Sequence, residues 1–234
     1  MKIKANKNII DDGFNAELVE TAVFTGLLEI PLIKKPDEFI IPKSMIPFSE
    51  RNKSEHFEEF VCFYEHDIRF RDILTATKEQ ITSLNKFKGV ISPDCSLYYD
   101  MPLVLQMTNT YLNRQIGHYL QTQGIYVIPN VRWGDERSYT RITPDADELP
   151  FAFLGLEKHG IYSIGTYGCC KTAEYKHYLR EGLRSFIKEI EPEIILVYGA
   201  MPDSIFGEFK KEVQFVHFDD WTKVQHDKVG KKNG

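Results

Sequence analysis

A repeating order of strand-like and helix-like segments constrains this chain more than any other feature of its 234 residues. Short runs of β-branched and aromatic residues are separated by stretches long enough for helices. Several runs are apolar without strict alternation, which is typical of parallel strands covered on both faces, and parallel strands need long crossover connections. We therefore predict an α/β domain with a mostly parallel sheet of repeated βα units. The runs are 60–67, 87–94, 125–131, 161–168, 193–200 and 213–220.

The same rhythm fits a TIM-like barrel, complete or incomplete, and also an open doubly wound sheet. Both architectures place ligands at the carboxyl ends of the strands. Residues 1–50 are broken by four prolines, so we expect an irregular N-terminal wrap of the same domain. Residues 51–226 form the predicted α/β domain, and residues 227–234 a flexible tail. The segment 171–190 is a regular amphipathic pattern, which we interpret as a structural helix.

Composition excludes several classes of protein. The net charge is −5 and the basic residues form no continuous stripe, so binding to duplex nucleic acid is not expected. No apolar run approaches the length of a membrane helix and the N-terminus has no secretory signal, which predicts a cytoplasmic protein without a membrane partner. The four cysteines lack metal-binding spacing and the glycine fingerprints of nucleotide loops are missing, so we expect neither metal nor cofactor.

Polar side chains follow most of the predicted strands. In a parallel sheet such positions gather at one edge, which predicts a ligand site there, although each residue taken singly is better explained as a helix cap. The aromatic residues Tyr98, Tyr99, Tyr139 and Tyr167 and the arginines Arg132, Arg137 and Arg141 lie in the same loops, suited to stacking on a ring or holding an anion; ordinary surface positions are the alternative. The residues that we expect to bind a ligand here are Asp67, Ser96, Asn130, Trp133, Thr166 and Tyr198.

Two carboxylates are the candidate catalytic groups. Asp94 ends an apolar strand after Pro93, and Asp135 follows the next strand along the chain. Paired carboxylates are what glycosidic bond chemistry uses, one as proton donor and one as nucleophile or stabiliser. A turn-forming aspartate after proline is the competing explanation for Asp94.

The segment 101–123 carries a single formal charge, Arg114, whereas a solvated helix would carry several. Asn109 and Asn113 fall with Gln106 within a narrow arc at helical spacing. This stripe of amides predicts either ligand contacts, to which we assign Asn109, Asn113 and Arg114, or a buried polar network. A homodimer interface is the competing interpretation.

Several short motifs between residues 60 and 199 carry a resemblance. They are Pro93-Asp94 with Ser96, Asp100-Met101-Pro102, Asn113-Arg114 with Tyr119 and Gln121, Ile128-Pro129 with Trp133, and Tyr198-Gly199. In these the chain resembles an uncharacterised family of bacterial and phage proteins, domain of unknown function 4417. It departs from the family at Glu65-His66, where the family is more acidic. The resemblance implies a bacterial or mobile-element origin and brings no settled activity.

The order of strand endings is also similar, at fold level only, to the TIM barrels of tRNA-guanine transglycosylases, and for this reason we favour the TIM-like barrel. Together these observations predict an enzyme that binds a nucleobase, a nucleoside or a similar ring-bearing polar ligand, with the reaction at a glycosidic bond. The alternative is a noncatalytic module of a phage or plasmid that sequesters a ligand or binds another protein.

Overall fold

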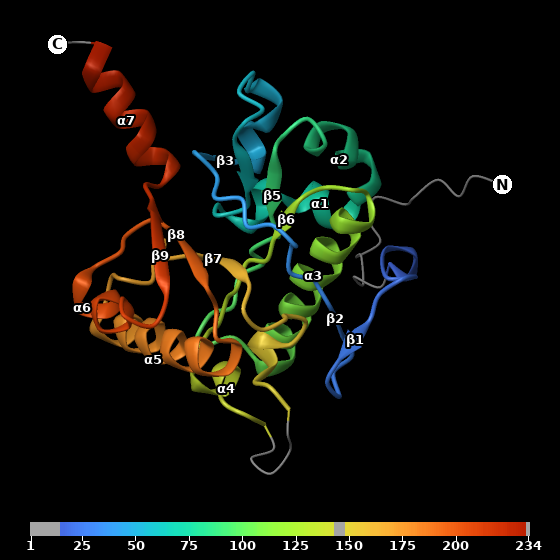
Figure 1. The fold of residues 1–234 in the computed structure, drawn as a ribbon, viewed down its shortest axis with the longest axis vertical. Helices are drawn as coiled ribbons and strands as arrows, with labels where there is room; N and C mark the ends of the chain where they lie inside the picture. The colour runs from blue at the N-terminus through green and yellow to red at the C-terminus, as the bar shows by residue number, and fades with distance from the viewer. Residues whose placement is uncertain (1–14, 143–147, 233–234) are drawn as a thin grey trace.

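The computed structural model describes residues 15–142 and 148–232. Strands and helices alternate along most of this range, as predicted (Figure 1). The strands are β1 (Phe24–Thr25), β2 (Ile30–Pro31), β3 (Met45–Pro47), β4 (Phe60–Cys62), β5 (Gly89–Ile91), β6 (Val127–Ile128), β7 (Ile161–Gly165), β8 (Ile194–Tyr198) and β9 (Gln214–Phe218). The α-helices are α1 (Arg71–Thr75), α2 (Thr77–Leu84), α3 (Leu103–Thr122), α4 (Glu136–Tyr139), α5 (Ala173–Ile190), α6 (Asp203–Phe206) and α7 (Trp221–Lys232). Short 3-10 helices are η1 (Ala16–Leu18), η2 (Phe48–Lys53), η3 (Asp67–Arg69), η4 (Phe151–Phe153) and η5 (Gly207–Phe209).

The strands form two parallel sheets in chain order, β3-β4-β5-β6 and β7-β8-β9. One parallel bridge, Asn130 with Ser163, joins them. There the Val131 N–H donates to the Ser163 carbonyl at 2.8 Å, and the Ser163 N–H donates to the Pro129 carbonyl at 2.9 Å. We call this junction the seam. The α/β class and the parallel sheets are thus confirmed. A TIM-like closure is not shown, because β3 pairs only with β4 and β9 only with β8 in the described ranges.

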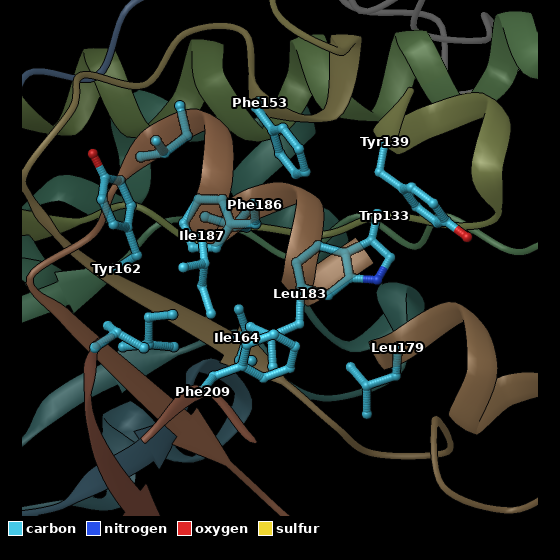
Figure 2. Packing of buried hydrophobic residues seen from close by; sticks show 14 of the residues in the cluster. Trp133, Tyr139, Phe153, Tyr162, Ile164, Leu179, Leu183, Phe186, Ile187 and Phe209 are labelled. Carbon is cyan, nitrogen blue, oxygen red and sulfur yellow. The ribbon is translucent and has the colours of Figure 1, made fainter. Parts of the chain in front are cut away.

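Each sheet has its own helical cover. Figure 1 shows α1, α2 and α3 beside the first sheet and α5 and α6 beside the second. The segment predicted as an amphipathic helix forms α5, which begins where the Thr172 hydroxyl accepts a hydrogen bond from the Tyr175 N–H and ends at Glu191 in the left-handed conformation. Leu183 and Phe186 lie on its apolar face and are buried in a cluster with other apolar side chains, several of them from β7 and β8 (Figure 2).

The other face of the strands meets in a shared apolar cluster. Phe60, Ile91, Ile128, Ile161 and Leu196 come from successive strands and are all buried. The Phe60 ring packs so closely against the backbone at Gly89 that a Cβ there would lie 2.4 Å from the ring. A glycine is required where a large ring on the neighbouring strand fills that space.

The chain ends differ in detail from the predicted division. The first 50 residues include a small antiparallel hairpin of β1 and β2, but they also supply β3, the first strand of the parallel sheet. At the other end α7 continues to Lys232, so most of the segment expected as a tail is helical. Residues 1–14 of the predicted wrap and residues 233–234 of the predicted tail lie outside the described ranges. In the part of the chain that is described, no helix has the length and apolarity needed to cross a membrane.

Candidate functional site

A cavity of about 260 Å³ opens at the carboxyl ends of β6 and β7. Its walls come from the loop after β5, the residues after β6, the loop after β7 and the first turns of α5. Arg132 and Lys171 are the charged residues that line it, and none of the described lining residues is Asp or Glu. Five tyrosines and one tryptophan also line it: Tyr98, Tyr99, Tyr167, Tyr175, Tyr178 and Trp133.

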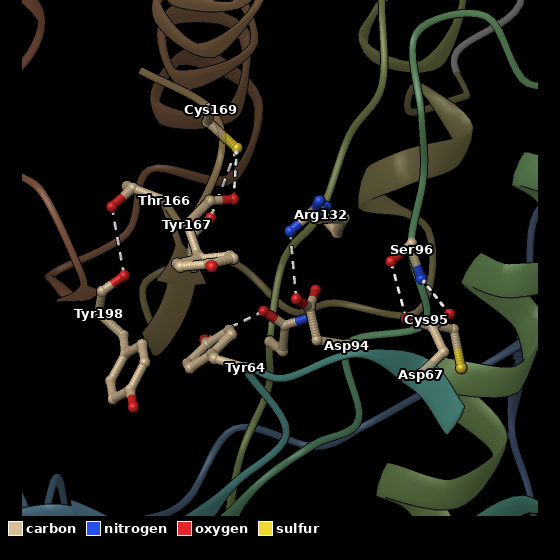
Figure 3. A network of polar contacts seen from close by, with 12 residues as sticks. Tyr64, Asp67, Asp94, Cys95, Ser96, Arg132, Thr166, Tyr167, Cys169 and Tyr198 are labelled. Atoms are coloured by element: carbon tan, nitrogen blue, oxygen red, sulfur yellow. Dashed lines mark hydrogen bonds and ion pairs between the residues drawn. The ribbon is translucent and has the colours of Figure 1, made fainter. Parts of the chain in front are cut away.

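Arg132 is held in the cavity wall by the buried Asp94 (Figure 3). One Asp94 oxygen accepts from the Arg132 guanidinium at 3.1 Å, and the other accepts from the Asn130 side-chain amide at 2.9 Å. Asp94 is only 6% exposed. Both carboxylate oxygens are therefore occupied by the protein, and it is the guanidinium that faces the cavity.

Asn130 is anchored in turn across the seam. Its side-chain oxygen accepts from the Tyr64 hydroxyl at 3.1 Å, and the same hydroxyl lies 2.6 Å from the Ser163 hydroxyl. Tyr64 reaches this position because Gly165 has no side chain, since a Cβ there would lie 2.4 Å from the Tyr64 ring. A continuous polar chain thus runs from Ser163 and Tyr64 through Asn130 and Asp94 to Arg132, and it fixes the guanidinium in place.

Burial raises the pKa of Asp94, and the charge of Arg132 and the hydrogen bond from Asn130 offset this only in part. A carboxyl whose pKa is raised in the folded state contributes stability that is present below its ordinary value of 3.8 and is lost as pH rises through the raised value. We expect Asp94→Asn to remove this titration. The free energy of unfolding of the variant, relative to the parent, should increase as pH rises above 3.8, as measured by urea denaturation across the pH range. A difference that stays constant with pH would contradict the raised pKa.

Comparison with known proteins identifies the family. A family model described as "Domain of unknown function (DUF4417)" matches residues 22–219. The chain belongs to this family. Two curated relatives are the Gene 1 proteins of Mycobacterium phage L5, 29% identical over 139 residues, and of Mycobacterium phage D29, 27% identical over 139 residues. The matched region is 59% of this chain in both cases, and it is 56% of the first relative and 48% of the second, so the chain spans about half the length of these relatives. No solved structure matches.

The amide stripe predicted on α3 forms a buried polar network in this family member. Asn113 accepts from the Cys95 N–H at 2.7 Å and donates to the Cys95 carbonyl, while Asn109 donates to the Ser96 carbonyl at 2.6 Å. Ser96 is also held by Asp67, which accepts from its N–H and hydroxyl at 3.1 and 2.8 Å. These four predicted site residues therefore shape the loop after β5, which forms one wall of the cavity, and none of them lines the cavity itself.

Arg114 has a structural role of a different kind. Its guanidinium donates to the carbonyls of Asn130, Ala152 and Leu154 at 2.8, 2.9 and 3.0 Å, and only 1% of the residue is exposed. Burial lowers its pKa to about 10, which still leaves the group charged at neutral pH. The single charge in the α3 sequence is thus a buried clamp between α3, β6 and the segment before β7.

Asp135 is the N-cap of α4. Its carboxylate accepts from the Arg137 N–H at 3.0 Å and from the Arg137 guanidinium at 2.8 and 2.7 Å. Burial opposes the charged form, but the contacts with Arg137 prevail and lower the pKa of Asp135. Asp135 is absent from the cavity lining, as is Asp94. The two carboxylates are engaged in separate networks, one with Arg132 and one with Arg137.

Trp133 is the predicted binding residue that does line the cavity. Most of its ring is buried against α5, with Nε1 donating to the Tyr178 carbonyl at 3.0 Å and the ring over Gly182, where a Cβ would clash (Figure 2). Thr166 and Tyr198 lie at the ends of β7 and β8. Thr166 donates to the Ala200 carbonyl at 2.7 Å, and the Tyr198 hydroxyl accepts from the Trp221 N–H at 2.8 Å.

Sequence reasoning missed the contribution of the β7–α5 connection. Cys169, Lys171, Tyr175 and Tyr178 all line the cavity, although the amphipathic pattern of the segment that contains most of them predicts only a structural helix. A signal was available, because Tyr175 and Tyr178 are three residues apart, share one face of the helix and follow a glycine-ended strand. The four cysteines are free thiols, and the described residues contain no group of three side chains arranged to hold a metal ion.

Proposed function

We propose that the chain binds a small ring-bearing ligand with a negative charge, of the nucleoside monophosphate class, in the tyrosine-lined cavity. The observation that carries the proposal is the position of Arg132, whose guanidinium is fixed by Asp94 beside the aromatic walls. Arginine held in this way presents a fork of N–H donors that suits phosphate oxygens.

The electrostatic balance of the cavity supports an anion. Arg132 and Lys171 supply two positive charges to the described lining, and no lining carboxylate opposes them. Asp94 neutralises part of the Arg132 charge, but both of its oxygens are bonded within the protein and Asp94 does not line the cavity. An anionic group that enters the cavity therefore meets two cations and no carboxylate of the described lining.

The aromatic walls support a flat ring. Tyr99 packs edge-on against Tyr175 at 5.2 Å and stacks with Tyr178 at 5.9 Å, so these rings hold one another in place. Tyr98 and Tyr167 are 53% and 60% exposed, and the Lys171 ammonium lies 5.8 Å from the centre of the Tyr167 ring, so a ring and a cation stand together in this wall. Stacking between a base and an aromatic side chain contributes about 1–3 kcal/mol. The cavity volume of about 260 Å³ restricts the ligand to a small one.

Of the two possible functions, we favour noncatalytic binding or sequestration of the ligand over catalysis. Hydrolysis or transfer at a glycosidic bond most often uses two carboxylates against the sugar, and the described lining of the cavity has none. An enzymatic reaction at this site would have to use another group. We further propose that the strands form an incomplete TIM-like barrel that is open between β9 and β3, and that the protein acts in the cytoplasm of a bacterial host.

The test uses the two tryptophans as separate reporters, since the chain contains only Trp133 and Trp221. Protein labelled with 5-fluorotryptophan gives two fluorine resonances, which Trp221→Phe assigns. We expect adenosine, guanosine, cytidine or uridine monophosphate to produce a saturable shift of the Trp133 resonance, with weaker binding of the matching nucleoside. If none of the four nucleotides moves the Trp133 resonance at millimolar concentration, the proposal is wrong.

A further inference from the structure

A second recess lies on the other side of Tyr167. Its volume is about 240 Å³, and Tyr167 lines both it and the cavity described above. The walls come from the carboxyl ends of β3, β4 and β8 and from the first turn of α7. The proposed nucleotide site does not use this space. The charged residues that line the recess are mostly acidic, whereas those that line the first cavity are basic.

Carboxylates dominate the charge of this recess. Glu50, Glu65 and Asp220 line it, and Arg69 is the lining cation, with His66 beside them. Glu50 is paired with Lys53 at 3.0 Å. Glu65 is different, because its oxygens accept from the Ser49 N–H and hydroxyl at 2.9 and 2.6 Å, which are neutral donors. In the described ranges no lysine or arginine forms an ion pair with Glu65.

Aromatic faces enclose the same space. Tyr64, Tyr167, Tyr198 and Trp221 line the recess. The rings of Tyr64 and Tyr198 are 9% and 2% exposed and stack on each other at 4.9 Å, whereas Tyr167 is 60% exposed. The Trp221 backbone is fixed, since its N–H donates to the Tyr198 hydroxyl at 2.8 Å. A carboxylate beside an accessible aromatic ring attracts an organic cation by ion pairing and by the cation–π interaction.

We propose that this recess binds a small organic ammonium group, with Glu65 as its ionic partner and the Tyr167 and Trp221 rings as its aromatic walls. The donor set favours an organic cation over a divalent metal ion, because the described residues contain no group of three metal-ligating side chains. The recess and the proposed nucleotide site differ in their charged residues and in the sign of that charge, so neither proposal depends on the other.

Arg69 is the internal competitor for this position. It is exposed on η3, lines the recess, and forms no ion pair within the described part of the chain. A guanidinium on a long side chain can approach Glu65 when the recess is empty. Neutralising Arg69 should therefore strengthen the binding of an external ammonium, whereas neutralising Glu65 should weaken it.

The fluorotryptophan-labelled protein tests this directly, because Trp221 lines the recess and Trp133 does not. The probe is n-butylammonium chloride, and sodium chloride at equal ionic strength is the reference. We expect a saturable shift of the Trp221 resonance with the Trp133 resonance unchanged. Glu65→Gln should weaken the apparent affinity roughly fivefold or more, and Arg69→Gln should strengthen it.

Glu58→Gln is the matched control, since it removes the same charge from an exposed position before β4, at the opposite end of that strand. It should leave the butylammonium affinity unchanged. A Trp221 shift that sodium chloride reproduces, or one that Glu65→Gln leaves intact, overturns the inference. Because nucleotides report on Trp133 and the ammonium on Trp221, failure of one proposal is distinguishable from failure of the other.

Discussion

Replacing Arg114 with leucine is expected to lower the free energy of unfolding by about 4 kcal/mol, a larger loss of stability than we expect from a substitution at any other predicted site residue. The guanidinium satisfies three carbonyls in a region closed to solvent. Leucine leaves all three without a donor, and each buried, unsatisfied carbonyl costs about 1–3 kcal/mol before relaxation. Urea denaturation followed by circular dichroism measures the change.

Two further variants define the cause. Arg114→Lys keeps the charge but lacks the planar fork, so it should recover only part of the lost stability. Arg71→Leu makes the same exchange at an exposed arginine of α1 and should change stability by less than about 0.5 kcal/mol. If Arg114→Leu is as stable as Arg71→Leu, the three carbonyls are satisfied in another way and the clamp is not needed.

Replacing Arg132 with glutamine is expected to have the largest effect on ligand binding. Loss of charge-assisted hydrogen bonds to the anionic group should weaken the affinity for a nucleoside monophosphate by about 2 kcal/mol, roughly thirtyfold in Kd. Titration calorimetry or the Trp133 fluorine shift measures it. The affinity for the uncharged nucleoside should change much less, because the tyrosine walls remain in place.

Controls separate contact from positioning. Arg71→Gln makes the same exchange at an exposed arginine of α1 that does not line the cavity, and it should leave binding intact. Asp94→Asn keeps the Arg132 guanidinium but weakens its anchor, so it should produce a smaller loss than Arg132→Gln. Equal loss for nucleotide and nucleoside in Arg132→Gln would indicate a general disturbance of the cavity and would contradict the assigned anion contact.

The order of elements was predictable from the sequence because runs of β-branched residues and amphipathic helices carry a local signal. The strand ends were also located correctly enough to identify Asp94, Asn130 and Trp133 as neighbours of a cavity. The periodicity of the sequence does not show which polar side chains are hydrogen-bonded to one another in the folded protein. Asp94 and Asp135 are both carboxylates, as the members of a catalytic pair would be, yet each forms an ion pair with a nearby arginine.

The roles of α3 and α5 show the same limit. The amides of α3 are unusual in the sequence, but they hold the loop after β5 through the Cys95 and Ser96 backbone. Tyr175 and Tyr178, the α5 tyrosines that line the cavity, are ordinary residues of an amphipathic helix, and only their spacing marks the face that they share. The packing of loops that are distant in the sequence decides which face of a helix lines a cavity. A local sequence pattern does not contain that information.

The seam is a weak connection between the two parallel sheets. β7 and β8 pair along five residues, whereas β6 and β7 are joined by a single bridge. Both the tyrosine-lined cavity and the second recess have walls on either side of this junction. Any molecule that occupies them contacts both halves and disfavours their separation, so by mass action its concentration sets how tightly the two halves are held together.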